Sequence, residues 1–392
     1  MKFDPLRFIL VSIVMSLALA PALGAAGEKK ADPPAYRFQT VVEVKHTPVK
    51  DQYHTGTCWC FATVSFLEAE ALRLGKGEFD LSEMYVVRRT YPRKALNYVQ
   101  MHGHAVHQQG GQAHDVIDRL RDSGLMPEEA YSGLNIGQKR HDHGEMVAVL
   151  QALADAVMKR EGSRVTPRWL EAYEGALDAY LGRLPAEFAW KGRTYTPRSF
   201  ADQALGLDAS DYVELTSYDA HPYYAKCRLE IPDNWTYNAD YYNLPIDELE
   251  AVVEKALSGG YSVVWDGDVS EKDFSTRETG WALVPEKDWE DRTMAEREKK
   301  PAAPVKEKQV DQAMRTATLR DFTTTDDHLM HIVGLAQDQT GARFYRIKNS
   351  GGTDRKYDGY LYMSRPYFRL KTTALMVNKS SLAPELRSKL GI

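Results

Sequence analysis

The sequence lacks the features of a nucleic-acid-binding, nucleotide-binding or membrane-spanning protein. Its formal net charge is −5, so there is no basic excess to bind phosphates. No internal repeat and no glycine-rich phosphate loop occurs, and beyond the first 26 residues no apolar run is long enough to cross a membrane. With 43% hydrophobic and 27% charged residues, the chain has the composition of a soluble globular protein. We therefore expect no nucleic-acid partner.

Cysteine is also scarce, because the 392 residues include only Cys58, Cys60 and Cys227. An odd number without regular spacing indicates no disulfide framework. If Cys58 is reactive, we expect the other two to be buried free thiols, although they could pair.

Three histidines, His102, His104 and His107, lie close together and raise the question of a metal site. No Asp, Glu or Cys accompanies them at the spacing of a metal site. We predict a polar loop there, with no metal and no cofactor.

The N-terminal segment has the form of a secretory signal peptide. Lys2 and Arg7 precede an apolar run over 8–20, and small residues follow up to residue 26. A membrane anchor is the alternative, but the run is short for a span. We predict a signal peptide over 1–26, a polar linker over 27–36, a secreted or periplasmic location, and no membrane contact after cleavage.

The most informative segment surrounds Cys58. Gln52 stands six residues before it, Trp59 follows it, and a helix-like run continues over 61–70. A thiol at the start of a helix meets the positive end of the helix dipole and unpaired N–H groups, which favour the nucleophilic thiolate. Gln52 could donate a side-chain N–H to an oxyanion beside the Cys58 amide.

A base and a group to orient it occur far downstream. His328 begins an apolar, strand-like run, and a turn-like segment over 337–341 leads to a second strand that ends before Asn349. Such a hairpin can place the two side chains together. Nucleophile, base and orienting residue are then all present, and we expect a thiolate–imidazolium pair in the resting enzyme.

These stretches resemble papain-fold cysteine peptidases, specifically the bleomycin hydrolase and aminopeptidase C branch. Leu81-Ser82-Glu83 and the glycine pair after Gln109 agree with that branch, as do segments up to about residue 380. The resemblance implies an α+β, two-lobed papain-like fold, with a helical lobe that carries the nucleophile helix and a β-barrel-like lobe that carries His and Asn. It implies these catalytic residues: Cys58, His328, Asn349 and Gln52.

The resemblance also implies peptide substrates, cleavage at free peptide N-termini, and a homo-oligomer, since hexamers occur in that branch. The residues expected to contact substrate are Gly110, Gly111, Trp59 and Asp268. We expect a peptidase domain over 37–385 and a C-terminal tail over 386–392. Amphipathic spacing at 146–159 and 168–183 predicts a helical insertion at about 140–210.

Two departures leave alternatives open. Gly351 stands where the family has a tryptophan that covers the Asn–His pair, and the tail after Asn349 is short for a branch in which the C-terminal arm lies in the cleft. The short tail favours an endopeptidase of the same fold, and Gly351 favours a catalytically inactive peptide-binding or scaffold homologue. An acyl transferase with related triad logic ranks last, because it usually has Asp as the orienting residue.

Overall fold

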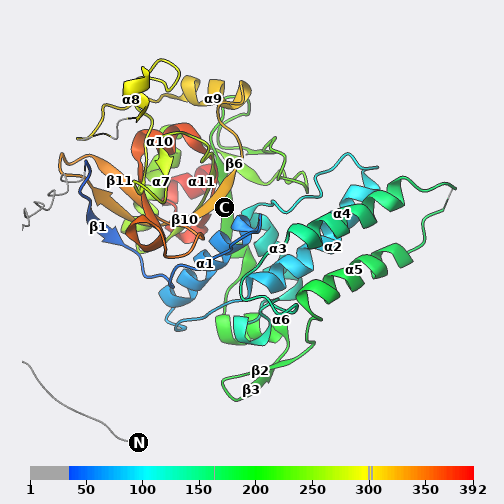
Figure 1. The fold of residues 1–392 in the computed structure, drawn as a ribbon. Coiled ribbons are helices and arrows are strands. Elements are labelled where there is room, and N and C mark those ends of the chain that lie inside the picture. The colour runs from blue at the N-terminus through cyan, green and yellow to red at the C-terminus, as the bar shows by residue number, and fades with distance from the viewer. Residues whose placement is uncertain (1–34, 163, 299–300, 302) are drawn as a thin grey trace, which may run out of the picture.

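The computed structural model describes residues 35–162, 164–298, 301 and 303–392. The predicted signal peptide and nearly all of the predicted linker therefore lie outside the described residues. Figure 1 shows helices gathered on one side and most strands on the other, with α1 (Cys58–Arg73) between them. The predicted mixture of helices and strands is confirmed.

Helix α1 forms the centre of the molecule because it is apolar on nearly every side. Its side chains are buried from Trp59 through Ala71, as expected for a helix enclosed by other elements. Two acidic residues within this stretch are satisfied internally: Glu68 accepts from Thr47 Oγ1 at 2.5 Å, and Glu70 accepts from Arg73 Nε at 2.8 Å. The burial holds the first residue of the helix, Cys58, in a fixed position.

The helical lobe packs on one side of α1. Its elements are α2 (Glu83–Gln100), α3 (Ala113–Ser123), α4 (Gly144–Met158), α5 (Arg168–Leu181) and α6 (Pro197–Phe200), the short helices at Glu128–Ala130, Ala201–Leu205 and Ala209–Asp211, and the hairpin β2 (Phe188–Trp190) and β3 (Arg193–Tyr195). The predicted insertion corresponds to α4, α5 and the hairpin. Leu150 and Leu177 belong to the same hydrophobic cluster as Phe66 of α1. The division of the chain into a peptidase domain and an insertion stays a prediction.

The other lobe contains an 11-stranded mixed sheet within the described part of the chain. In spatial order its strands are β5 (Lys226–Cys227), β6 (Tyr241–Asn243), β4 (Tyr212–Thr216), β13 (Thr372–Asn378), β7 (Val263–Gly267), β10 (His328–Gln337), β11 (Arg343–Lys348), β12 (Tyr360–Ser364), β9 (Trp281–Ala282) and β8 (Phe274–Ser275), with β1 (Gln39–Glu43) paired to β10. The two end strands of this order do not pair with each other. The expectation of a β-barrel-like lobe is therefore corrected to an open sheet.

Helices cover this sheet and complete its core. They are α7 (Ile246–Ser258), α8 (Met294–Glu298), α9 (Gln312–Arg320), α10 (Arg365–Lys371) and α11 (Pro384–Leu390), with single turns at Lys356–Gly359 and Lys379–Ser381. Leu249 and Val253 of α7 share a hydrophobic cluster with Trp265, Ile332 and Ile347 of the sheet. Among the described helices, none combines the length and the apolar character that a bilayer crossing requires.

Candidate active site

The Cys58 thiol lies at the first residue of α1 and is half-buried. The preceding residue, Thr57, makes no side-chain hydrogen bond to the first turn, so the N–H groups there keep their positive potential. Cys60 and Cys227 are buried, and all three thiols are unpaired. Cys58 is thus the most accessible thiol of the three.

The side chains predicted to act as base and orienting residue are hydrogen-bonded to each other. His328 is the first residue of β10, Asn349 directly follows β11, and these strands pair antiparallel. His328 Nε2 lies 2.8 Å from Asn349 Oδ1, which also accepts from the Ser350 backbone N–H at 2.8 Å. An oxygen acceptor makes Nε2 the donor, so Nδ1 of the neutral ring is the nitrogen that can accept a proton.

Gln52 joins this group through the chain that leads to α1. The Ser350 hydroxyl donates to Gln52 Oε1 at 2.6 Å, and the two residues are also linked through the Gln52 backbone N–H to Ser350 O at 2.9 Å. Gln52 Nε2 donates one hydrogen to Thr55 O at 2.7 Å. An amide nitrogen carries two hydrogens, so the second remains for a substrate oxygen. The residues predicted as catalytic therefore gather at the junction of α1 with β10 and β11.

The electrostatic environment of the thiol differs from the expectation. Burial, with a smaller contribution from the charges of Asp233 and Asp326, raises the pKa of Cys58 to about 12, although the backbone N–H groups of Leu329 and Trp59 act in the opposite direction. Burial also lowers the pKa of His328, while Asn349 acts in the opposite direction. Both shifts favour a neutral thiol and a neutral imidazole. Both shifts act against the expected resting thiolate–imidazolium pair, which stays a prediction.

The glycine pair lies next to the nucleophile helix. The Trp59 indole N–H donates to Gln109 O at 2.9 Å, and a Cβ on Gly111 would lie only 3.1 Å from the Trp59 ring. A Cβ on Gly110 would lie 1.9 Å from Asp233 Oδ2. Both positions therefore require glycine. Trp59 itself has 0% exposure, so it supports the glycine pair from below, and the expectation that it contacts substrate is corrected.

Asp268 was expected in the cleft, but its carboxylate has no exposed surface. Its oxygens are occupied by Lys371 Nζ at 3.2 Å, by the Ser270 N–H and hydroxyl at 2.7 Å each, and by the Thr325 N–H at 3.2 Å. A buried carboxylate with a buried lysine partner holds structure together. We therefore withdraw Asp268 from the substrate-binding residues.

Three other carboxylates lie near Cys58, and the sequence analysis did not single them out. They are Asp233, in the segment between β5 and β6, Asp266 on β7, and Asp326, two residues before His328. The β7–β10 pairing places Asp266 opposite Leu329. Only the closeness of Asp326 to His328 was visible in the sequence; the other two depend on strand register and loop packing.

The space beside Gly351 is open. A Cβ built on Gly351 meets only Arg355 Nε within 4 Å, at 3.8 Å. No aromatic ring among the described residues therefore replaces the family tryptophan at that direct position. The Asn349–His328 hydrogen bond is correspondingly less shielded from water.

The C-terminal residue lies in a different cavity. Ile392 lines a cavity of about 570 Å³ together with His114, Glu214 and Lys379. None of the predicted catalytic residues lines that cavity. Ile392 therefore lies away from the residues predicted as catalytic, whereas in the resembled branch the C-terminal arm lies in the active-site cleft.

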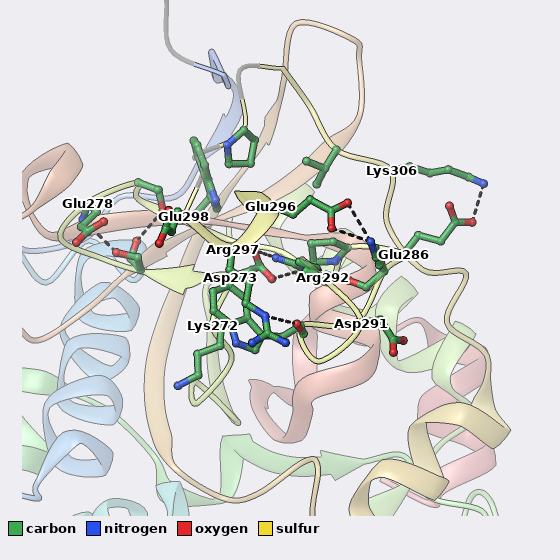
Figure 2. A pocket seen from close by; sticks show the side chains of 18 residues that line it. Lys272, Asp273, Glu278, Glu286, Asp291, Arg292, Glu296, Arg297, Glu298 and Lys306 are labelled. Atoms are coloured by element: carbon green, nitrogen blue, oxygen red, sulfur yellow. Dashed lines mark hydrogen bonds and ion pairs between the residues drawn. The ribbon is translucent and has the colours of Figure 1, made fainter. Parts of the chain in front are cut away.

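A second cavity, of about 820 Å³, lies at residues 272–306 and includes no predicted catalytic residue (Figure 2). Its charged side chains largely neutralise one another: Arg292 pairs with Asp273 at 2.7 Å, and Lys287 pairs with Glu296 at 2.8 Å. These ion pairs use the charged groups within the segment itself and leave no arrangement of a reaction site among its described residues.

The structure explains the position of one of the three clustered histidines. His107 is buried and hydrogen-bonds Tyr173 Oη at 2.9 Å and Gln151 Oε1 at 3.1 Å. Within the part of the chain that the structure describes, no group of three or more His, Cys, Asp or Glu side chains is placed to hold a metal ion.

The fold and the residues gathered around Cys58 define a cysteine peptidase of the papain type. Residues 187–391 match the profile of the Peptidase C1-like family, which is more than half of the chain, so this chain belongs to that family. The matched region includes His328 and Asn349, whereas Cys58 and Gln52 precede it. The predicted family and the predicted enzyme class, a cysteine-type peptidase, are confirmed.

Curated relatives and a solved structure agree with this assignment. "Cysteine proteinase 1, mitochondrial" of Saccharomyces cerevisiae is 25% identical over 90% of this chain and 79% of its own length. "Aminopeptidase G" of Lactobacillus delbrueckii subsp. lactis is 23% identical over 86% of this chain and 82% of its own length. The crystal structure of pepw from Lactobacillus rhamnosis superposes with a TM-score of 0.66 at 18% identity, covering 90% of this chain and 84% of that one, which confirms the papain-like fold.

The comparisons correct the predicted location. The yeast relatives are named as mitochondrial proteins, which contradicts the secreted or periplasmic location expected from the N-terminal segment. That segment lies outside the described residues.

Proposed function

We propose that this protein hydrolyses peptide bonds with Cys58 as nucleophile, His328 as base, Asn349 as orienting residue and Gln52 as oxyanion donor, and that it acts on free peptide N-termini. The observation that carries the proposal is the 2.8 Å hydrogen bond from His328 Nε2 to Asn349 Oδ1, made where β10 meets the first turn of α1. This bond leaves His328 Nδ1 as the proton acceptor.

The mechanism follows from these groups. His328 Nδ1 takes the proton of the Cys58 thiol while the sulfur attacks the scissile carbonyl carbon. The oxygen becomes an oxyanion that accepts from the Cys58 backbone N–H and from Gln52 Nε2. The imidazolium then returns the proton to the leaving amine as the C–N bond breaks, and a thioester remains. Water, deprotonated by His328, hydrolyses the thioester and restores the thiol.

Two measurements test the catalytic assignment. Cys58→Ala is expected to abolish peptidase activity and leave the melting temperature nearly unchanged, with Cys227→Ala as the control that keeps activity. A thiol-directed epoxide followed by peptide mapping is expected to label Cys58. Activity that survives in Cys58→Ala refutes the proposal, and an unlabelled Cys58 favours a peptide-binding homologue.

Endopeptidase activity is the second candidate, favoured by the position of Ile392 in another cavity. Without an arm in the cleft, nothing contributed by the tail stops a peptide from extending past the glycine pair. A free-amine aminoacyl reporter compared with its N-acetylated twin separates the two. Preference for the acetylated reporter identifies an endopeptidase.

The assembly state is also a proposal. The resemblance implies a homo-oligomer, with the hexamer of that branch as the specific expectation. Size-exclusion chromatography with light scattering checks it: a single species at the mass of one 44.3 kDa chain contradicts it.

A further inference from the structure

Asp233 occupies a fixed position against the glycine pair. Its neighbours in sequence are buried anchors: Asn234 Nδ2 donates to Leu229 O at 2.9 Å and to Asn238 O at 3.0 Å, and the Trp235 indole N–H donates to an aspartate of α3 at 2.9 Å. The Asp233 carboxylate consequently touches the Gly110 Cα, where the absence of a Cβ gives it room. The loop holds this half-buried carboxylate beside the backbone that lines the cleft.

The Asp233 carboxylate is unpaired within the described part of the chain. Among the described residues, no N–H or O–H group donates a hydrogen bond to it, and no cationic side chain lies within 4 Å of its oxygens. The buried Lys94, whose charge acts on Asp233, donates instead to Gly110 O. The Asp233 oxygens are not among the fully enclosed polar atoms without a partner, so a donor that arrives from solvent can reach them.

A second acidic group, formed by Asp266 and Asp326, lies nearby. Asp266 has 2% exposure, and its Oδ2 accepts from Thr373 Oγ1 at 2.7 Å, but no protein donor reaches Oδ1 other than a proton shared with Asp326. Asp326 also accepts from Gln112 Nε2 at 3.2 Å. Burial raises the pKa of Asp266 to about 7 and that of Asp326 well above its ordinary value. Both carboxyls are therefore harder to ionise than usual, and a bound cation would favour their ionised forms.

Charges on these carboxylates raise the pKa of Cys58, and the carboxylates raise one another's pKa values. Asp233 and Asp326 raise the pKa of Cys58, and Asp233 raises the pKa of both members of the Asp266–Asp326 pair. The backbone places these groups together: Asp266 pairs with Leu329, Asp326 lies two residues before His328, and Asp233 lies against Gly110. Acidic groups therefore lie close to both His328 and the glycine pair.

We propose that Asp233, with the Asp266–Asp326 pair, binds the α-ammonium group of the peptide substrate next to Cys58. This inference rests on the proposed aminopeptidase function and specifies how it selects free N-termini. An ammonium group supplies three donors and a positive charge, which is what these carboxylates lack.

The same contacts couple recognition to chemistry. In the free protein, the carboxylates hold the Cys58 proton on sulfur. A bound ammonium group neutralises their field, so transfer of the proton from Cys58 Sγ to His328 Nδ1 becomes easier once the substrate is seated. An N-acetylated peptide brings no charge and leaves the thiol protonated. The selection of free N-termini therefore appears in kcat as well as in KM.

The test compares three reporters on the full chain: a free-amine aminoacyl amide, its N-acetylated twin, and an N-acetylated dipeptide amide with lysine before the scissile residue. Asp233→Asn is expected to lower kcat/KM for the free-amine reporter about 10–100-fold, the range for a hydrogen bond to a charged group. The acetylated twin should lose no rate and should gain somewhat, because the Cys58 thiol ionises more readily without the Asp233 charge. Asp233→Glu should restore part of the loss, and Glu230→Gln, an exposed carboxylate three residues away, should change nothing.

A loss confined to the lysyl reporter overturns the assignment, because the subsite would then bind a side-chain ammonium. An unchanged preference in Asp233→Asn also overturns it and leaves the proposed aminopeptidase function standing. If the wild-type protein itself prefers the acetylated reporter, the proposed function fails instead.

A second readout does not depend on turnover. The rate of alkylation of Cys58 by iodoacetamide, followed against pH by mass spectrometry, reports the thiolate, since Cys60 and Cys227 are buried. Asp233→Asn should move this profile to lower pH, and Glu230→Gln should not. A profile that stays in place in Asp233→Asn, with an unchanged melting temperature, contradicts the electrostatic coupling.

Discussion

Removal of the Asn349 side chain is the sharpest test of the proposed triad. Asn349→Ala deletes the acceptor of His328 Nε2 at 2.8 Å and also the acceptor of the Ser350 backbone N–H at 2.8 Å. The bond to His328 matters most when the ring is an imidazolium, that is, during proton transfer from Cys58 and to the leaving amine.

The magnitude follows from the exposure of this pair. A hydrogen bond to a charged group contributes about 1.5–3 kcal/mol. His328 and Asn349 are both only partly buried, and the position of Gly351 leaves space beside them, so water competes and the lower half of the range applies. About 2 kcal/mol corresponds to a loss of roughly 30-fold in kcat/KM.

The assay is kcat/KM on the free-amine reporter, with the iodoacetamide rate of Cys58 at neutral pH as a second measure. Since Asn349 raises the pKa of His328, Asn349→Ala lowers that pKa further, disfavours the imidazolium and slows alkylation. Asn349→Asp keeps an acceptor and serves as the matched control, with most of the activity retained. A loss below about threefold in Asn349→Ala, with the melting temperature intact, would refute the role of Asn349.

Three further outcomes are expected. Gln52→Ala should cost about 3–4 kcal/mol of barrier, seen as a fall of roughly 10²–10³ in kcat with KM little changed; a rise in KM alone would argue against the oxyanion role. Lys371→Met should destabilise the fold by about 3–5 kcal/mol in chemical denaturation, because it leaves the buried Asp268 carboxylate unpaired; a stability near wild type would show that Asp268 finds another partner. Gly110→Ala should displace the Asp233 carboxylate, since the new Cβ would lie 1.9 Å from Oδ2; it should lower the preference for free-amine over acetylated reporters without abolishing alkylation of Cys58, and an unchanged preference would count against that contact.

The parts of the site that could be predicted from the sequence are those encoded by short segments. Cys58 at a helix start follows from a local run of helix-forming residues after it. His328 and Asn349 come together because one antiparallel hairpin joins them, with Ile332 opposite Ile347. Each of these depends on contacts close in sequence or within one hairpin, where periodicity and turn signals are informative.

The acidic residues could not be assigned in the same way. Asp266 and Asp268 lie two positions apart on or next to β7, and strand periodicity alone places them on the same face. What separates them is their long-range partners: Asp268 meets Lys371, whereas Asp266 meets Thr373 and Asp326. The prediction that Trp59 contacts substrate was wrong for a similar reason, because only the fold shows that its indole N–H donates to Gln109 O.

The open space beside Gly351 and the carboxylates near Cys58 act in the same direction. Without a tryptophan at Gly351, water reaches the Asn349–His328 hydrogen bond and weakens its hold on the imidazolium. The carboxylates near Cys58 oppose the thiolate. Each lowers the population of the charged Cys58–His328 pair before substrate arrives. A cationic substrate reverses the second effect alone, so a Gly351→Trp variant that shields the hydrogen bond should depend less on the substrate's ammonium group than the wild-type protein does.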